Sequence, residues 1–318
     1  MTAPLRRIGT SDLHITPLVL GGNVFGWTAD QAASFAVLDA FVDGGGVLID
    51  TADVYSAWVP GHRGGESESV IGEWLRRSGK RDRVLIATKV GMLPGEGGDK
   101  LAPTRIAAAC EASLRRLGTD RIDVYFAHQD DDTTAQEEYL TAFGKLVEAG
   151  KIRVVGASNF TAARLRSALA LARSALHLPR VDILQPEYNL VSRGTFEGEL
   201  QDLCVAADVA VVPYYGLASG FLTGKYRSEA DLAKSVRGGR MKDLLAGKGM
   251  AVLAAVDAVA AETGATPAQI ALAWLIAQPG VTAPIASATS AEQLTELLPA
   301  MTLRLGDDQL ARLTAAGV

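Results

Sequence analysis

The stretch Gly46-Val-Leu-Ile-Asp-Thr-Ala-Asp-Val-Tyr55 decides how the rest of the chain is interpreted. Val47–Ile49 is a short apolar run, rich in β-branched residues, that follows three glycines and predicts a buried strand. The strand ends at Asp50, and Tyr55 lies in the loop that follows. A carboxylate at the end of a buried strand, with a phenol shortly after it, is not what core packing needs. We therefore interpret this stretch as part of a functional site.

Similar apolar runs recur along the chain, and helical patterns separate them. The predicted strands are Leu18–Gly22, Val47–Asp50, Val84–Lys89, Ile122–His128, Val154–Ser158, Val181–Gln185, Val209–Tyr214 and Val281–Ser287. Predicted helices include 28–42, 67–77 and 103–117, and Thr-x-x-Gln/Glu capping boxes at 28–31, 134–137 and 266–269 mark three helix starts. Ahead of the first strand, residues 6–8 and 13–15 with the turn-prone 9–12 between them predict a small hairpin.

Eight strands that alternate with helices predict an α/β fold with a parallel sheet. Because the alternation never reverses, the simplest architecture is a closed (β/α)₈ TIM barrel, which the whole 1–318 chain forms as one domain with an N-terminal hairpin. An open, doubly wound sheet is the competing architecture. No Gly-x-Gly-x-x-Gly follows the first strand and no Walker A sequence is present, so neither phosphate-binding motif favours the open sheet.

Composition excludes several classes of function. The 31 Lys and Arg residues are outnumbered by 36 Asp and Glu residues, which argues against a nucleic-acid surface, and no basic run suggests an anionic membrane partner. Near the N-terminus Asp12, His14 and Pro17 interrupt any signal-like apolar segment. Cys110 and Cys204 are expected to be reduced, buried thiols. We expect a cytoplasmic protein that acts on a small molecule, in an oligomeric state that the sequence does not indicate.

Polar residues stand at the ends of successive predicted strands. They are Asp50, Lys89, His128, Ser158, Gln185 and Tyr214. In a (β/α)₈ barrel the carboxyl ends of the strands carry the active site. The first three come from consecutive strands and should lie side by side around one mouth of the barrel, where Tyr55 joins them from its loop.

This set of side chains suits proton transfer to an oxygen atom. A free tyrosine has a pKa of about 10, and a nearby ammonium stabilises its phenolate and is expected to lower that pKa. A carboxylate keeps the ammonium charged in a partly dry pocket. Asp50, Lys89 and Tyr55 can therefore protonate an oxygen whose carbon has just received a nucleophile, and His128 can offer an N–H to the same oxygen.

Other chemistries have less support. The four histidines, His14, His62, His128 and His177, are scattered without ligand spacing, so no metal is expected, and no Gly-x-Ser-x-Gly elbow is present. A barrel hydrolase or isomerase that uses Asp50 and Asp53 as acid and base stays open as an alternative.

The motifs together resemble the aldo-keto reductase superfamily. They are Asp50-Thr-Ala-x-x-Tyr55, Thr88-Lys89, His128 with acidic residues behind it, Gly150-Lys-Ile-Arg-x-x-Gly156-Ala-Ser-Asn159-Phe160, Gln185-Pro-Glu-Tyr-Asn189, and Pro213-Tyr214 through Gly220-Phe-Leu-Thr-Gly-Lys225-Tyr226. The match runs from about Gly21 to Leu298, and it is most similar to the bacterial branch related to potassium-channel β subunits. The resemblance implies a barrel that binds NADPH across its C-terminal face and transfers hydride to an aldehyde or ketone.

The resemblance also implies a role for each matching residue. Tyr55 would be the general acid, with Lys89 and Asp50 tuning it and His128 orienting the substrate. The cofactor-binding residues would be Ser158, Asn159 and Gln185 at the carboxamide, Tyr214 stacked on the nicotinamide, Gly216, Leu217, Ser219, Gly220, Leu222 and Lys225 in a strap over the pyrophosphate, and Ser287, Thr289, Gln293 and Glu296 at the adenosine end. Trp27 and Trp58 would wall the substrate pocket.

Two departures from the family pattern bear on the cofactor. The strap reads Tyr215-Gly216-Leu217 where many relatives have Ser-Pro-Leu, and the adenosine end has no cation at Ser287, Thr289, Gln293 or Leu297. A 2′-phosphate normally meets an Arg or Lys, which Arg237 or Arg240 could supply from the segment after the seventh strand. NADPH is expected ahead of NADH. A nucleotide-sensing partner protein, similar to the channel β subunits and with weak or no turnover, is the alternative to an enzyme.

Overall fold

The computed structural model describes residues 3–175, 178–234 and 238–317, with Arg240 described by its backbone alone. Eight parallel strands form one sheet in the order β10-β3-β4-β5-β6-β7-β8-β9. They are β3 (Val19–Gly21), β4 (Leu48–Asp50), β5 (Leu85–Val90), β6 (Ile122–Ala127), β7 (Ile152–Ser158), β8 (Val181–Gln185), β9 (Ala210–Val211) and β10 (Ile285–Ala286). A bridge between Val211 and Val281, and a 2.8 Å hydrogen bond from Ile285 N to Pro213 O, join the two edges. The prediction of a (β/α)₈ barrel is confirmed.

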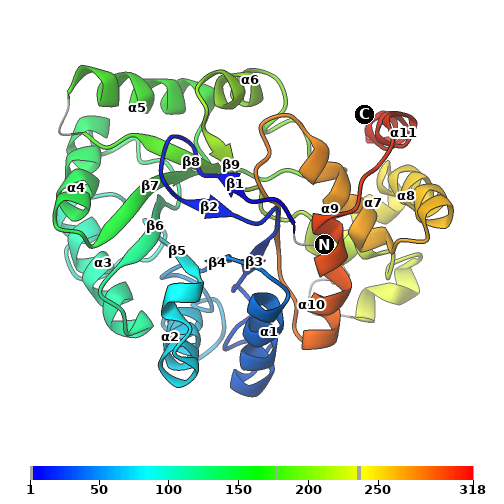
Figure 1. Ribbon diagram of the computed structural model, residues 1–318, viewed down its shortest axis with the longest axis horizontal. Coiled ribbons are helices and arrows are strands. Elements are labelled where there is room, and N and C mark those ends of the chain that lie inside the picture. Colours follow the sequence, from blue (N-terminus) through cyan, green and yellow to red (C-terminus); the bar gives the residue numbers. More distant parts are fainter. Residues whose placement is uncertain (1–2, 176–177, 235–237, 318) are drawn as a thin grey trace.

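Helices surround the barrel (Figure 1). They are α1 (Gln31–Asp43), α2 (Glu66–Ser78), α3 (Pro103–Leu117), α4 (Gln136–Glu148), α5 (Ala162–Ser174), α6 (Glu199–Ala206), α7 (Lys242–Ala246), α8 (Gly249–Thr263), α9 (Pro267–Ala277), α10 (Ala291–Leu297) and α11 (Asp307–Ala316). Short 3₁₀ helices are η1 (Arg81–Arg83), η2 (Ala218–Thr223), η3 (Glu229–Lys234), η4 (Gly238–Met241) and η5 (Leu298–Met301). Of the three predicted capping boxes, the one at Thr266 and Gln269 is present at α9.

The capping boxes predicted at Thr28 and Thr134 are wrong. Helix α1 is capped by Asp30, whose carboxylate accepts from Ala33 N at 2.9 Å. Helix α4 begins at Gln136 without a side-chain cap, because Thr134 Oγ1 donates instead to Asp131 Oδ2 at 2.7 Å. In both places a nearby carboxylate is the stronger hydrogen-bond acceptor.

The last two barrel strands are shorter than predicted. Strand β9 ends at Val211 and β10 starts at Ile285, next to Pro213 and Pro284 respectively. A proline has no N–H to donate to a ladder, so the regular pairing stops beside each one.

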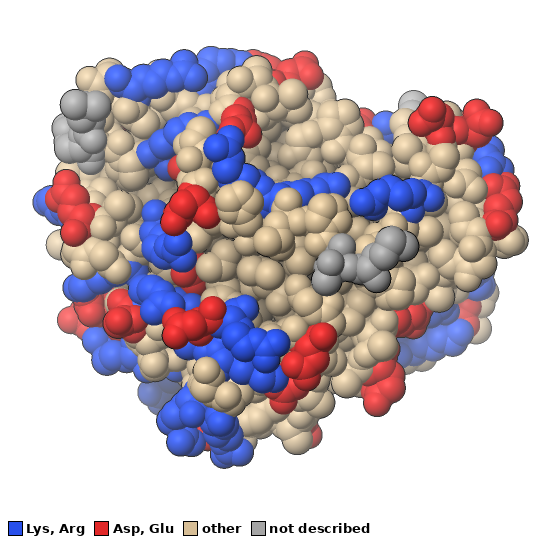
Figure 2. All heavy atoms as spheres, viewed as in Figure 1, with Lys and Arg blue, Asp and Glu red and all other residues tan. Residues whose placement is uncertain are grey.

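The predicted hairpin is confirmed and closes the N-terminal end of the barrel. Strands β1 (Arg6–Arg7) and β2 (His14–Ile15) pair antiparallel, and Figure 1 shows them lying across the barrel. Ile8 and Ile15, both fully buried, belong to the same apolar cluster as the inward-facing residues of the strands, such as Val124. Charged side chains of both signs are interspersed over this face (Figure 2).

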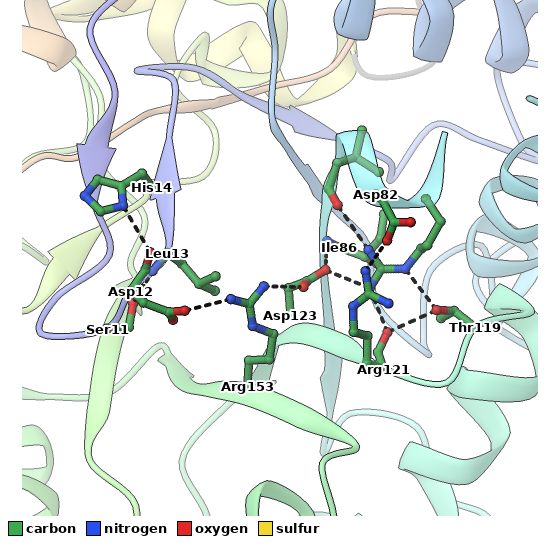
Figure 3. Close-up of polar contacts among 12 residues, drawn as sticks. Ser11, Asp12, Leu13, His14, Asp82, Ile86, Thr119, Arg121, Asp123 and Arg153 are labelled. Carbon is green, nitrogen blue, oxygen red and sulfur yellow. Dashed lines mark hydrogen bonds and ion pairs between the residues drawn. The ribbon is translucent and has the colours of Figure 1, made fainter. Parts of the chain in front are cut away.

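An ion-pair network centred on the buried Asp123 ties the hairpin to the strands (Figure 3). Arg153 reaches Asp12 at 3.0 Å and Asp123 Oδ1 at 3.2 Å. The other oxygen of Asp123 accepts from Arg81 Nη2 at 2.8 Å and from Ile86 N at 2.9 Å. Both carboxylate oxygens of this buried residue therefore have partners.

Within the described residues no single helix is long and apolar enough to span a membrane. Helices α8 and α9 meet that test only as a pair, and they bend by 97° at the break between them. Cys110 and Cys204 are buried and free, and burial raises the pKa of each thiol to about 12.

Candidate active site

The polar strand ends meet around one large cavity at the C-terminal mouth of the barrel. The parallel register aligns Gly21 with Asp50, and Ser158 with Gln185. The cavity has a volume of about 800 Å³, within the range of ligand sites. Loops and strand ends after all eight barrel strands line it, and the predicted Asp50, Tyr55, His128, Ser158, Asn159, Gln185 and Tyr214 are among its walls.

Lys89 lies directly behind the cavity wall and joins the predicted carboxylate to the predicted phenol. Its Nζ donates to Asp50 Oδ2 at 2.7 Å, to Tyr55 OH at 2.9 Å and to Thr51 O at 2.7 Å. The side chain is fully buried, while Asp50 is 2% exposed. Three acceptors match the three protons of the ammonium, so its orientation is fixed. The structure therefore brings together the three residues that the sequence analysis grouped.

The pKa of Tyr55 differs from the expectation. Burial raises it well above its ordinary value, and the negative charge of Asp50 raises it further. Burial also lowers the pKa of Lys89, while the Asp50 carboxylate opposes that shift. The predicted lowering of the tyrosine pKa is wrong, because desolvation outweighs the neighbouring ammonium. The phenol is held protonated, which is the state that a proton donor needs.

His128 is a neutral imidazole at the cavity wall. Its pKa is lowered well below the ordinary value, first by burial and then by the charge of Lys89. Its ring centroid lies 6.0 Å from that of Tyr55. The buried Nδ1 has no hydrogen-bond partner in the described structure. Unpaired buried acceptors are less rare than unpaired buried N–H groups, which favours the tautomer with the proton on Nε2.

Four further residues form a connected polar wall beside this group. Gln185 Nε2 donates to Asp50 Oδ1 at 2.9 Å, which leaves the amide oxygen to accept from a ligand. Ser158 Oγ donates to Gln185 O at 2.8 Å. Asn159, with a φ of 60°, donates to His128 O at 3.0 Å and accepts from Tyr214 OH at 2.8 Å. These bonds fix an aromatic ring and several amide groups at one side of the cavity.

The predicted strap crosses the mouth after β9. Gly216, Leu217, Ser219, Gly220 and Lys225 all line the cavity. Gly220 has a φ of 93°, which favours glycine and turns the backbone toward the opening. Leu222 does not line the cavity but is fully buried in the main core. Lys234, which the sequence analysis missed, lines the cavity, and its Nζ donates to Lys225 O at 3.1 Å.

The predicted adenosine end follows β10. Ser287, Thr289, Gln293 and Glu296 line the cavity, as do Leu297 and Asn23, which accepts from Ser287 Oγ at 2.7 Å. Ser290 caps α10 by accepting from Gln293 N, and Gln293 Oε1 accepts from the backbone N–H and the hydroxyl of Thr289. No described Lys or Arg from this segment lines the cavity. Arg237 and the side chain of Arg240 lie outside the described residues.

The substrate walls agree in part with the sequence analysis. Trp58 lines the cavity and is 49% exposed. Trp27 does not line it; the indole supports Trp58 edge-on at a centroid distance of 5.5 Å. Met92, from the loop after β5, and Val54 also line the cavity. Neither was predicted, because nothing in the sequence marks which side of a long loop faces a cavity.

Asp53, the proposed partner of Asp50 in a hydrolase, does not line the cavity and is fully buried. Its carboxylate points to Arg105 at 3.3 Å, so the structure separates the two carboxylates into different environments. Among the described residues no three His, Cys, Asp or Glu side chains are placed to hold a metal ion.

Comparison with known proteins gives the family of this (β/α)₈ barrel, which is a family of oxidoreductases. Residues 17–317 match the model of the aldo/keto reductase family, so the chain belongs to that family. The "uncharacterized oxidoreductase YrpG" of Bacillus subtilis (strain 168) is 33% identical, with 96% of this chain and 93% of that protein covered. Protein tas of Escherichia coli (strain K12) is 32% identical over 97% and 96%. "Aldo-keto reductase yakc [NADP(+)]" of Schizosaccharomyces pombe (strain 972 / ATCC 24843) is 30% identical over 96% and 89%.

Proposed function

We propose that this protein reduces an aldehyde or ketone to the alcohol, or catalyses the reverse oxidation, with NADPH as the cofactor and NADH as the alternative. The observation that carries the proposal is the contact of Lys89 Nζ with both Tyr55 OH and Asp50 at the wall of the mouth cavity. The nicotinamide supplies the hydride when bound. The residues of the chain supply the proton and hold the reacting groups.

Tyr55 is the proton donor in this proposal. Its hydroxyl, kept neutral by burial, gives its proton to the carbonyl oxygen as that oxygen gains negative charge. Lys89, 2.9 Å away, stabilises the phenolate that results, and Asp50 keeps the ammonium charged. Charge shifts along this chain of short contacts instead of building up on the substrate.

His128 orients the carbonyl oxygen. A neutral ring with its proton on Nε2 donates one hydrogen bond without competing with Tyr55 as an acid. Its low pKa, caused by burial and by Lys89, keeps the ring in that state throughout the neutral range. With Tyr55 and His128 both bonded to it, the carbonyl oxygen is held in one orientation, so that one face of the carbonyl group is presented to the nicotinamide.

The cavity is lined by groups that suit each part of a nicotinamide dinucleotide. The Tyr214 ring offers an aromatic face, and Asn159, Ser158 and the Gln185 oxygen offer polar groups for the carboxamide. The strap brings backbone N–H groups together with Lys225 and Lys234, which suits a pyrophosphate. Ser287, Thr289 and Gln293 offer hydroxyl and amide groups to the adenosine. The name of the Schizosaccharomyces pombe relative, which includes NADP(+), supports the choice of NADPH.

The test is the oxidation of NADPH and of NADH, followed by absorbance, with a panel of aldehydes and ketones. We expect carbonyl-dependent oxidation that Tyr55→Phe lowers by about 10²-fold or more, with the dissociation constant of the dinucleotide unchanged. Tight dinucleotide binding without turnover of any carbonyl would instead favour the nucleotide-sensing alternative. Turnover that needs no dinucleotide and survives Tyr55→Phe would favour a hydrolase or isomerase.

A further inference from the structure

A second cluster of buried charges lies behind the Asp50, Lys89 and Tyr55 group. Asp53 and Glu68 are fully buried, and Arg105 is 6% exposed. With Arg116, they form ion pairs between the loop after β4 and helices α2 and α3. None of the four lines the cavity. Burying several charges is unfavourable unless they are well paired, so the cluster needs a reason beyond packing.

Asp53 belongs to the turn that carries Tyr55. Asp53 N donates to Lys89 O at 3.3 Å, and Tyr55 N donates to Ala52 O at 3.2 Å. On its side-chain end, Asp53 Oδ2 accepts from Arg105 Nη2 at 3.3 Å. The turn is therefore attached to the backbone of Lys89 on one side and to helix α3 on the other.

Arg105 connects this turn to a second loop of the mouth. Its Nη1 donates to Glu96 O at 3.2 Å, in the loop after β5 that also carries the cavity residue Met92. One buried guanidinium therefore sets the relative position of the loop that carries Tyr55 and the loop beside it.

The two carboxylates of the cluster differ in how well they are bonded. Glu68 accepts from Thr88 Oγ1 and from Arg116 Nε, each at 2.6 Å, so both its oxygens are bonded. Asp53 Oδ1 and Arg105 Nε, although buried, have no partner in the described structure. Asp53 has one side-chain partner, Arg105, at 3.3 Å, and the backbone N–H of Val54 also favours its ionised form. The ionisation of Asp53 decides whether the contact with Arg105 stays an ion pair.

Charges from every side act on Asp53. Burial raises its pKa to about 7, Glu68 of α2 raises it too, and Arg105 and Arg116 of α3 oppose the shift. Lys89 of β5 is influenced in turn, since the charges of Asp53 and Glu68 raise its pKa against the effect of burial. Tyr125 of β6 also faces the cluster. A pKa of about 7 places the change of charge of Asp53 near neutral pH.

We propose that Asp53 is a positioning residue of the reductase: its carboxylate, anchored by Arg105, fixes the turn that carries Tyr55 and adds negative charge behind Lys89. The inference rests on the proposed function, because it gives Asp53 a part in that reaction. Asp53 does not reach the cavity, so it acts through Tyr55 and Lys89 and not on the substrate.

The test compares the pH dependence of kcat in the wild type, Asp53→Asn and Arg105→Gln. In the wild type we expect kcat to fall as the pH drops through about 7. Asp53→Asn keeps the shape of the side chain but removes its charge. Above pH 7 its kcat should therefore be about tenfold below that of the wild type, and the fall in kcat below about pH 7, the acid limb of the profile, should disappear. KM and the dissociation constant of NADPH should stay within about twofold, because the cavity wall is unchanged. Arg105→Gln should move the limb to higher pH, since Asp53 loses its counter-charge.

Asp123→Asn is the matched control, because Asp123 is equally buried and ion-paired but lies at the N-terminal end of the barrel. It should lower the melting temperature and leave kcat and the acid limb unchanged. Wild-type kcat and an unchanged limb in Asp53→Asn would overturn the inference, as would an equal loss of kcat in Asp123→Asn. If Asp53→Asn does not fold, an unmoved limb in Arg105→Gln overturns it. A wild type that reduces no carbonyl overturns the proposed function and this inference with it, whereas an active wild type whose kcat and acid limb are shared by Asp53→Asn overturns the inference alone.

Discussion

The two ends of the barrel both bury carboxylates next to cations, but they bond them differently. At the N-terminal end, Asp123 accepts from Arg153, Arg81 and Ile86 N, which occupies both of its oxygens. At the C-terminal mouth, the one side-chain contact of the Asp53 carboxylate, to Arg105, is 3.3 Å long, and neither Asp53 Oδ1 nor His128 Nδ1 has a partner within hydrogen-bonding distance in the described structure. A fully bonded buried group helps to fix the structure, whereas a buried polar atom without a partner is unfavourable.

Backbone conformation divides the two ends in the same way. Non-glycine residues with positive φ occur in the mouth loops at Ser56, Lys100, Asn159, Tyr215, Ala218 and Ser219, and elsewhere in the described chain only at Asp208. Such conformations are unfavourable for residues with a Cβ and persist where the surrounding contacts enforce them. We therefore expect the backbone of the mouth loops to lower the free energy of unfolding while it places functional groups, and the contacts of the hairpin end to raise it. The following experiments test that division.

The largest effect is expected for Lys89→Met. The substitution removes the group that stabilises the phenolate of Tyr55, so kcat should fall by about 10²-fold or more in steady-state assays. Binding of the dinucleotide should be retained, because Lys89 does not line the cavity. Arg81→Met, at the other end, should leave kcat unchanged. A Lys89→Met protein with more than about a tenth of the wild-type kcat would remove the contrast between the ends.

The next effect is on stability and belongs to the N-terminal end. Asp123→Ala leaves Arg81 and Arg153 without their buried partner and Ile86 N without an acceptor. The free energy of unfolding should fall by about 3 kcal/mol, as measured by urea denaturation. The kcat per folded molecule should not change. A loss below about 1 kcal/mol would mean that this network does little to hold the hairpin end together.

A third experiment tests how the raised pKa of Asp53 affects stability at different pH values. The folded pKa of Asp53, about 7, lies above its unfolded value of about 3.9, so its contribution to stability is complete below pH 4 and is lost as the pH rises through 7. Between pH 5 and pH 8 the wild type should lose about 2–3 kcal/mol relative to Asp53→Asn. Urea denaturation of both proteins at the two pH values measures this. A difference that does not change with pH would show that Asp53 is ionised normally in the folded state.

The smallest effect is expected at the surface of the hairpin. Arg7 pairs with Asp208, but their side chains are 49% and 62% exposed. Arg7→Ala should therefore change the free energy of unfolding by less than about 0.5 kcal/mol, measured by thermal melting. A larger loss would mean that this ion pair, and not the packing of Ile8 and Ile15 against the strands, seats the hairpin.

Local patterns predicted the barrel and the group around Lys89 for a physical reason. Parallel strands bring their carboxyl ends to one edge, so Asp50, Lys89 and His128 had to lie near each other once the strands were placed. The period of the apolar runs marks those strands directly. Tyr55 follows Asp50 closely enough that its loop cannot carry it elsewhere.

Features that depend on tertiary contacts were missed or misassigned. Leu222 points into the core because the strap turns through a 3₁₀ helix, and Trp27 supports Trp58 from behind instead of facing the cavity. Lys234 and Met92 reach the cavity from loops whose path no periodic pattern encodes. The raised pKa of Tyr55 follows from desolvation, which depends on packing that a sequence does not reveal.

The most direct test of the central claim is a single-turnover reaction with NADPH that carries deuterium at its transferable position. The wild type should convert an aldehyde to an alcohol that holds one deuterium for each NADPH consumed. Tyr55→Phe should bind NADPH with the same affinity but form this alcohol at least about 10²-fold more slowly. An alcohol without deuterium would contradict hydride transfer from the dinucleotide, and a Tyr55→Phe protein that reacts at the wild-type rate would contradict the assignment of proton transfer to Tyr55, Lys89 and Asp50.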